Sequence, residues 1–234
     1  MHFYITGDTH GDFSRIAEFC DENATTTEDV MIILGDAGIN YWLDFRDRNC
    51  KDEIAEMPIM LFCVHGNHEA RPWEAGDYDE VEWNGGLVYV EEEYPNILFA
   101  KDGEIYDFHG HSVIVIGGAY SVDKYYRIYN CMQWFKTEQP DDEIKAYVEK
   151  QLDSVNWTID VVLSHTVPID AEPVWNFIPG LDQSKVDKST EKWLQQIYDK
   201  LNLQMGWYAG HYHCEAEENG VRIMFEDYDE ICEE

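Results

Sequence analysis

Residues that could bind metal ions recur along the chain, each time directly after an apolar run and usually beside a glycine. Five runs end in this way, at Gly7-Asp8-Thr9-His10-Gly11-Asp12, Gly35-Asp36, Gly66-Asn67-His68-Glu69, Ser164-His165 and Gly210-His211-Tyr212-His213. Carboxylate oxygens, imidazole nitrogens and an amide oxygen, without any thiolate, suit divalent ions such as manganese, iron or zinc. The pattern therefore indicates a site for divalent metal ions.

The candidate ligands are too numerous for a single catalytic ion. They are Asp8, His10, Asp36, Asn67, His165, His211 and His213. One ion must keep positions open for substrate and water, whereas two ions that share a bridging carboxylate would use the whole set. Two ions about 3.5–4 Å apart stabilise both the attacking and the leaving oxygen of a displacement at phosphorus. The alternative is that these are loop residues whose polar groups are satisfied by turns and caps, but five coincidences in order weigh against it.

The apolar runs are expected to be strands that bring these residues together. In the first third of the chain, strands at 3–6, 30–34 and 59–64 alternate with amphipathic stretches at 13–20 and about 43–56. Alternation of strand and helix favours a largely parallel sheet, whose ligands gather at the carboxyl ends of the strands. We therefore expect the polar motifs to meet at one edge.

From residue 87 onwards the pattern changes. Short apolar runs at 87–90, 97–100, 104–108 and 112–116 follow one another without helices, which predicts antiparallel hairpins in a second sheet packed on the first. An irregular aromatic stretch at 119–139 follows. Two amphipathic helices are then predicted, one from Pro140 and one over 186–201, with a strand at 160–163 between them. A hairpin that turns at Asn219-Gly220 completes the pattern.

The composition limits the class of protein. The 234 residues suit one α/β domain, and 16 Lys and Arg against 48 Asp and Glu give a formal charge of -32. Such a charge opposes extended contact with long nucleic acids or an anionic membrane. Six cysteines without a CxxC pair, and an N-terminus without a signal-peptide pattern, predict free thiols in the cytoplasm. No apolar run approaches the roughly 18 residues of a membrane span.

The five motifs in this order resemble those of the calcineurin-like metallophosphoesterases, and they extend from residue 7 to residue 213. The resemblance implies an α/β fold, a four-layer α/β/β/α sandwich with two mixed sheets. We expect this domain to cover residues 1–225 and an acidic, solvated tail to cover 226–234. No heptad pattern or self-pairing edge predicts an oligomeric state.

The resemblance also implies a role for each motif residue. One ion would be held by Asp8, His10, Asp36 and His213. The other would be held by Asp36, Asn67, His165 and His211, with Asp36 as the bridge. The nucleophile would be a hydroxide activated by the ions, and His68 would protonate the leaving alkoxide or orient the phosphate. Asp12 and Glu69 are expected to fix imidazole tautomers.

The implied activity is hydrolysis of a phosphate ester, by a phosphatase or a phosphodiesterase, with two divalent ions (manganese, iron or zinc) as cofactors. The substrate would be a small phosphate ester or a phosphoprotein. Lys124 and Arg127 are candidate contacts for its phosphate, although pairing with the surplus acid explains these cations equally well. The alternative to an enzyme is a protein-binding scaffold with the same fold and an inactive site.

Overall fold

Strands of the first sheet carry three of the five motifs. The computed structural model describes residues 1–231, and the first sheet there has the strand order β13-β1-β2-β3-β6-β5-β4. Strands β1, β2, β3 and β6 are parallel, while β13, β5 and β4 pair antiparallel with their neighbours. The strands are β1 Phe3–Thr6, β2 Val30–Ile33, β3 Met60–Cys63, β4 Asp79–Trp83, β5 Gly86–Val90, β6 Ile97–Ala100 and β13 Tyr228–Ile231.

The second sheet carries the other two motifs and has the order β11-β12-β10-β9-β8-β7. Its central strands β12, β10, β9 and β8 are parallel, and the edge strands β11 and β7 are antiparallel to them. The strands are β7 Ile105–Phe108, β8 His111–Ile116, β9 Thr158–Ser164, β10 Asn202–Ala209, β11 Ala216–Glu218 and β12 Val221–Ile223. Both sheets are mixed, as expected.

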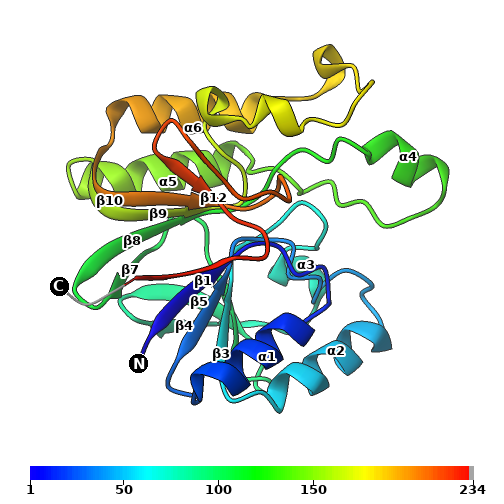
Figure 1. Ribbon diagram of the computed structural model, residues 1–234, viewed down its shortest axis with the longest axis vertical. Helices are drawn as coiled ribbons and strands as arrows, with labels where there is room; N and C mark the ends of the chain where they lie inside the picture. Colours follow the sequence, from blue (N-terminus) through cyan, green and yellow to red (C-terminus); the bar gives the residue numbers. More distant parts are fainter. Residues whose placement is uncertain (232–234) are drawn as a thin grey trace.

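Helices cover the outer faces of both sheets (Figure 1). Helices α1 and α2 lie against the first sheet, and α5 and α6 lie against the second. The helices are α1 Ser14–Asn23, α2 Phe45–Ala55, α3 Pro72–Ala75, α4 Lys124–Tyr129, α5 Asp142–Ser154 and α6 Ser189–Lys200, with 3-10 turns η1 Ile169–Ala171, η2 Val174–Asn176 and η3 Gln183–Lys185. These elements confirm the expected four-layer α/β/β/α sandwich.

Three apolar cores hold the layers together. The inner faces of the two sheets meet in the central core, where Phe3 stacks on Phe108 with ring centroids 4.2 Å apart. Side chains on the opposite faces of the strands pack under the helices, for example Ile33 under α1 and Ile114 under α5. Strands buried on both faces explain why the sequence shows continuous apolar runs rather than strict alternation.

Local chemistry explains several boundaries. The Asp141 carboxylate accepts hydrogen bonds from the backbone N–H groups of Glu143 and Ile144, which caps α5. Asn219 and Gly220 both have positive φ, the conformation of a two-residue hairpin turn between β11 and β12.

Two expectations from the sequence are wrong in part. Strands β5 and β6 do not join the second sheet; β6 pairs parallel with β3, with Leu61 opposite Ile97, and β5 and β4 extend that same edge. Burial determines which sheet β5 and β6 join, because the apolar faces of these strands complete the cores of the first sheet. The expected solvated tail also contains β13, which pairs antiparallel with β1. Residues 232–234 of that tail lie outside the described part of the chain.

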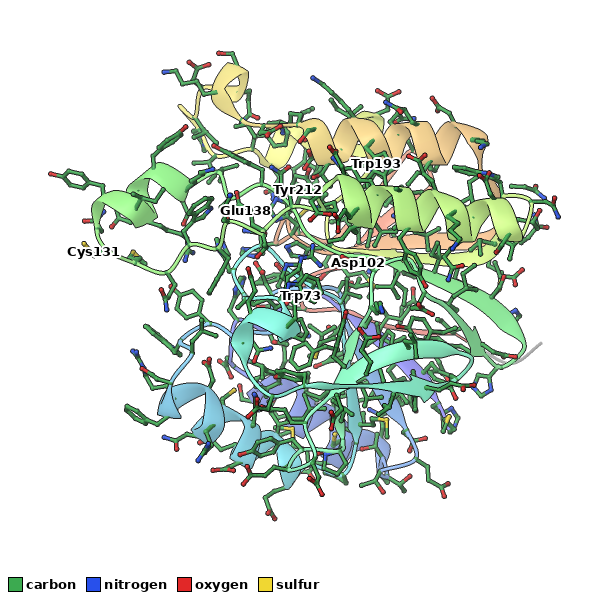
Figure 2. All side chains as sticks on the ribbon, turned by 180° about the vertical axis from the view of Figure 1, so that it is seen from behind. Trp73, Asp102, Cys131, Glu138, Trp193 and Tyr212 are labelled. Atoms are coloured by element: carbon green, nitrogen blue, oxygen red, sulfur yellow. The ribbon has the colours of Figure 1, made fainter. Side chains whose placement is uncertain are left out.

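The irregular stretch at 119–139 contains one short helix. Helix α4 projects away from the body of the molecule (Figure 1). Figure 2 shows Cys131 near the tip of this projecting segment and Glu138 back at its base. There, Glu138 accepts a hydrogen bond from the Trp134 indole at 2.7 Å, which links two residues within the segment.

Two expectations concern the setting of the protein. Over residues 1–231, no helix is long and apolar enough to cross a membrane. Five cysteines there are free, whereas Cys232 lies beyond the residues that the structure describes.

Candidate metal centre

All five motifs meet where strands β1, β2, β3, β9 and β10 end. The loop after β1 is tied to the loop after β2 because the His10 N–H donates to the Asp36 carbonyl at 2.8 Å. The loop after β10 is tied to the end of β9 because the Gly210 N–H donates to the His165 carbonyl at 3.0 Å. Both sheets therefore contribute side chains to one site.

The first group of candidate ligands surrounds the Asp8 carboxylate, which is buried. His213 Nε2 lies 3.1 Å from Asp8 Oδ2, and His10 Nε2 lies 3.7 Å from the same oxygen. The two Nε2 atoms are 2.8 Å apart. Three potential metal ligands thus converge on a volume about the size of one ion.

The second group surrounds the buried Asp36 carboxylate. His165 Nε2 lies 3.7 Å from Asp36 Oδ2. Asp8 also lies close to these two residues. The two groups are therefore contiguous and share the buried Asp8 carboxylate. Asp36 Oδ1 accepts a hydrogen bond from the His68 backbone N–H at 2.7 Å, which fixes its orientation.

The contact between His165 and Asn67 tests whether a cation fits here. His165 Nδ1 lies 2.8 Å from the Leu34 carbonyl oxygen, an acceptor only, so Nδ1 carries the proton and Nε2 presents its lone pair. Nε2 lies 2.8 Å from Asn67 Oδ1, because the Asn67 amide nitrogen donates to Ser121. As the Asn67 amide is oriented, its oxygen and the Nε2 lone pair face each other at a spacing that two ligands of one ion can adopt. The donor set therefore fits a divalent ion.

His211 joins the site through both its backbone and its ring. Its N–H donates to Asp8 Oδ1 at 3.0 Å, and its ring centroid lies 5.0 Å from that of His165. Burial holds the pKa of His211 well below its ordinary value, so the ring is neutral at neutral pH. A neutral imidazole is the form that binds metal ions.

The pKa values of Asp8 and His213 reflect their contact. Burial alone would raise the pKa of Asp8, but the hydrogen bond from His213 and the nearby imidazoles together hold it below its ordinary value. The same hydrogen bond raises the pKa of His213. Asp8 is therefore ionised and able to act as a ligand.

Glycines of the motifs allow the close approach of these side chains. A Cβ atom at Gly66 would lie 2.0 Å from Asp36 Oδ1, and one at Gly35 would lie 2.1 Å from His165 Nδ1. Gly35 also has a φ of +102°, which favours glycine. The glycines thus serve the geometry of the site as well as its turns.

His68 and Arg127 lie beside the candidate ligands. The His68 ring centroid lies 6.0 Å from that of His10. Arg127 comes from the projecting helix α4, and its Nη2 lies 3.3 Å from His68 Nε2. The same guanidinium pairs with Asp123 at 2.7 Å and donates to the Tyr41 hydroxyl at 3.1 Å. The sequence left two alternatives for Arg127, an ion pair with an acidic residue or a place at the site. In the structure Arg127 does both.

Three sequence expectations do not match the geometry. Asp12 accepts from the N–H and hydroxyl of Ser14 at the start of α1, and Glu69 accepts from the Gly66 N–H at 2.7 Å, so the contacts described for these carboxylates do not orient an imidazole. Glu69 is buried beside Asp36, and desolvation followed by that charge raises its pKa to about 8. The Lys124 ammonium lies over the Trp134 ring, 4.1 Å from the centroid, and Lys124 is not among the described residues that line the site.

A cavity of about 580 Å³ opens beside the candidate ligands. It is lined by His10, Asp36, Asn67, His68, His211 and His213, and also by Arg127 and Lys188. Sequence reasoning missed Lys188, because the 170–190 region carries no motif and only the fold brings it to the site. Lys188 forms an ion pair with Glu172 there.

A family model described as calcineurin-like phosphoesterase matches residues 1–222. The chain belongs to the calcineurin-like phosphoesterase family. Membership in this family supports a hydrolase that acts on phosphoester bonds, in which two metal ions are typical. The match covers all five motifs and ends before β13.

Solved structures share the fold of this calcineurin-like phosphoesterase at low sequence identity. One is 17% identical with a TM-score of 0.52, over 95% of this chain and 89% of that chain. TT1561 of Thermus thermophilus is 12% identical with a TM-score of 0.51, over 96% and 88%. A putative 5'-nucleotidase from Staphylococcus aureus is 15% identical, with a TM-score of 0.45 that is too low to support an inference. No curated protein matches the chain.

Proposed function

We propose that this protein hydrolyses small phosphate esters with the help of two divalent metal ions. The observation that carries the proposal is the contact of His165 Nε2 with Asn67 Oδ1, two acceptors 2.8 Å apart beside two contiguous groups of candidate ligands that share Asp8. A protein-binding scaffold would not require such a pair of facing acceptors in its interior, whereas a metal ion would stabilise them.

We propose that the residues would divide between the two ions in the way that the resemblance implies. Asp8, His10 and His213 would hold one ion, and Asn67, His165 and His211 would hold the other, with Asp36 shared. When bound, the ions would lower the pKa of a water molecule to supply a nucleophile and would neutralise charge on the phosphate. Manganese is the ion we propose to test first, because carboxylate, imidazole and amide ligands suit it.

The chain's own side chains would orient the phosphate and assist the leaving group. Arg127 can donate to phosphate oxygens in the cavity, and its contacts with Asp123 and Tyr41 hold the guanidinium in place before substrate binds. His68, next to Arg127, would donate a proton or a hydrogen bond to the leaving oxygen. Burial lowers the pKa of His68, which makes its protonated form a better acid.

The charge of the protein limits the substrate that we propose. A net charge of -32 repels long nucleic acids, so a small ester is favoured over a polymer. The positive groups that line the cavity, Arg127 and Lys188, would offset this repulsion locally. We further propose a reducing compartment, the cytoplasm, because all five cysteines within residues 1–231 are free thiols.

The test is hydrolysis of p-nitrophenyl phosphate and of bis-p-nitrophenyl phosphate by the manganese-loaded protein. We expect turnover that a chelator abolishes and manganese restores. His68→Ala and Asp36→Ala should lower kcat by about 100-fold or more, since each removes a group that acts at the reacting phosphate. The ratio of the two substrates shows whether the enzyme prefers monoesters or diesters.

A matched variant controls for nonspecific effects. His2 is a surface residue at the amino end of β1, the end opposite to the motif that follows this strand, so His2→Ala should retain wild-type turnover. Metal content is measured by elemental analysis for each protein. Wild-type protein that holds both ions and turns over neither substrate would contradict the proposal and favour the scaffold.

A further inference from the structure

The cavity beside the candidate ligands has two chemically different walls. One wall carries the candidate metal ligands with His68 and Arg127. Six apolar side chains also line the cavity and are called the apolar wall below: Tyr120, Val122, Phe177, Ile178, Leu181 and Val186. The remaining lining residues are polar: Asp123, Asn176, Gln183, Lys188, Glu191 and Tyr212. The phosphate and its leaving group would therefore meet different surroundings.

The apolar wall is not part of the packing that holds the fold together. In the described residues, the three hydrophobic cores include none of its six side chains, although Tyr120 is itself buried. Ile178 is 60% exposed although it is aliphatic. A ligand that covers such side chains removes their apolar surface from water. This burial lowers the free energy of the complex and so favours binding.

The segment that supplies most of this wall is attached to the histidine loop. The Asn176 side-chain amide donates to the Tyr212 carbonyl at 2.7 Å, and the Phe177 ring lies nearly parallel to the Tyr212 ring, with centroids 6.3 Å apart. Tyr212 stands between His211 and His213, and Figure 2 shows it between the outer helices and the body of the molecule. The Lys188 ammonium lies 4.7 Å from the Phe177 ring centroid. These contacts place the apolar wall at a fixed position relative to the candidate ligands.

Resting on the proposed function, we propose that the apolar wall binds the leaving group, and that the substrate is a phosphate ester of an alcohol with an aliphatic or aromatic body. The cavity of about 580 Å³ is the size of a small-molecule site. A leaving group rich in hydroxyls would lose hydrogen bonds to water against these side chains. An apolar leaving group would bind more tightly, because the same burial removes its apolar surface from water.

A series of n-alkyl phosphates tests this inference. Ethyl, butyl, hexyl and octyl phosphate have leaving groups of almost equal acidity, so they differ mainly in the apolar surface that they can bury. We expect kcat/KM to rise about fourfold for each added methylene until the cavity is filled. Concentrations stay below those at which the longer esters form micelles. A kcat/KM that does not change with chain length would overturn the inference.

Variants locate the effect on the wall. Ile178→Ser and Leu181→Ser should flatten the dependence of kcat/KM on chain length, because they should lower kcat/KM far more for octyl phosphate than for ethyl phosphate. The matched control is Val174→Ser, because Val174 is aliphatic, 67% exposed and not among the described cavity residues. That variant should keep the wild-type dependence. A loss of the dependence in Val174→Ser as well would place its cause outside the wall.

Binding of n-alkylphosphonates, which cannot be hydrolysed, separates this inference from the proposed function. Calorimetry on the manganese-loaded protein should show affinity that rises with chain length by a similar factor. Hydrolysis without a dependence on length would refute the apolar wall and leave the enzyme. Length-dependent binding without hydrolysis would refute the enzyme and leave the wall as a ligand site. Neither binding nor hydrolysis would overturn both.

Discussion

Substitution of Gly66 by alanine would place a methyl group inside the candidate metal centre. The new Cβ would lie 2.0 Å from Asp36 Oδ1 and 2.1 Å from the Asp36 backbone nitrogen. Nearly all real Cβ contacts are longer than 3.4 Å, so Asp36 or the loop after β3 must move by more than 1 Å. Asp36 Oδ1 is a side-chain atom, but the Asp36 nitrogen and Cα in contact belong to the backbone of a buried loop, so a rotamer change cannot relieve the strain.

The movement would break the hydrogen bond from the His68 N–H to Asp36 Oδ1, which is 2.7 Å long. Overpacking costs about 1–3 kcal/mol, and a lost hydrogen bond to a charged group costs about 1.5–3 kcal/mol. We therefore expect Gly66→Ala to lower the free energy of unfolding by about 2.5–6 kcal/mol. A shift of about 1 Å in a residue proposed to bridge two ions should also lower kcat about 100-fold.

Urea denaturation measures the first effect, and manganese binding and hydrolysis of p-nitrophenyl phosphate measure the second. Gly76→Ala is the control, because a Cβ there meets only Glu91 Oε1 at 3.7 Å and the backbone is extended. This variant should match wild type within about 1 kcal/mol. Gly66→Ala protein with wild-type stability, metal content and turnover would refute the argument that close approach to Asp36 requires glycine.

Two further predictions concern stability. Burial raises the pKa of Glu191 from 4.5 to about 7, so the folded state holds this proton more tightly than the unfolded chain does. The stabilisation is full below pH 4.5 and is lost as the pH rises to about 7, so the unfolding free energy of the wild type should decrease over this range. In Glu191→Gln the decrease between pH 5 and pH 8 should be smaller by about 2–3 kcal/mol. A variant with the same pH dependence as wild type would contradict this. Arg71 and Asp102 form a buried ion pair at 2.6 Å, and Arg71→Ala should cost about 3–5 kcal/mol because it leaves Asp102 buried and unpaired. Lys185→Ala breaks an exposed pair with Asp182 and should cost less than about 1 kcal/mol by the same urea measurement, so equal costs would refute the role of burial.

The fold was predictable because local signals and burial agreed. The runs that became β1, β2 and β3 are apolar on both faces, and each delivers its polar motif at the carboxyl end, where parallel strands place their ligands. The sequence does not predict which sheet β5 and β6 join, because short apolar strands pair with whichever sheet edge completes a core. Strand β13 was missed because its acidic sequence resembles solvated surface; only pairing with β1 makes it a strand.

The sequence by itself determined which residues can act as ligands, because Asp, His and Asn beside glycine at the ends of apolar runs carry that chemistry wherever the chain folds. Tertiary structure decided how these residues face one another, since contacts such as His165 with Asn67 join positions that the chain separates by 98 residues. It also decided what surrounds them. Arg127 reaches His68 from a projecting helix, and Phe177, Ile178, Leu181 and Val186 bring apolar side chains to the same cavity, because three-dimensional packing brings segments without motifs together.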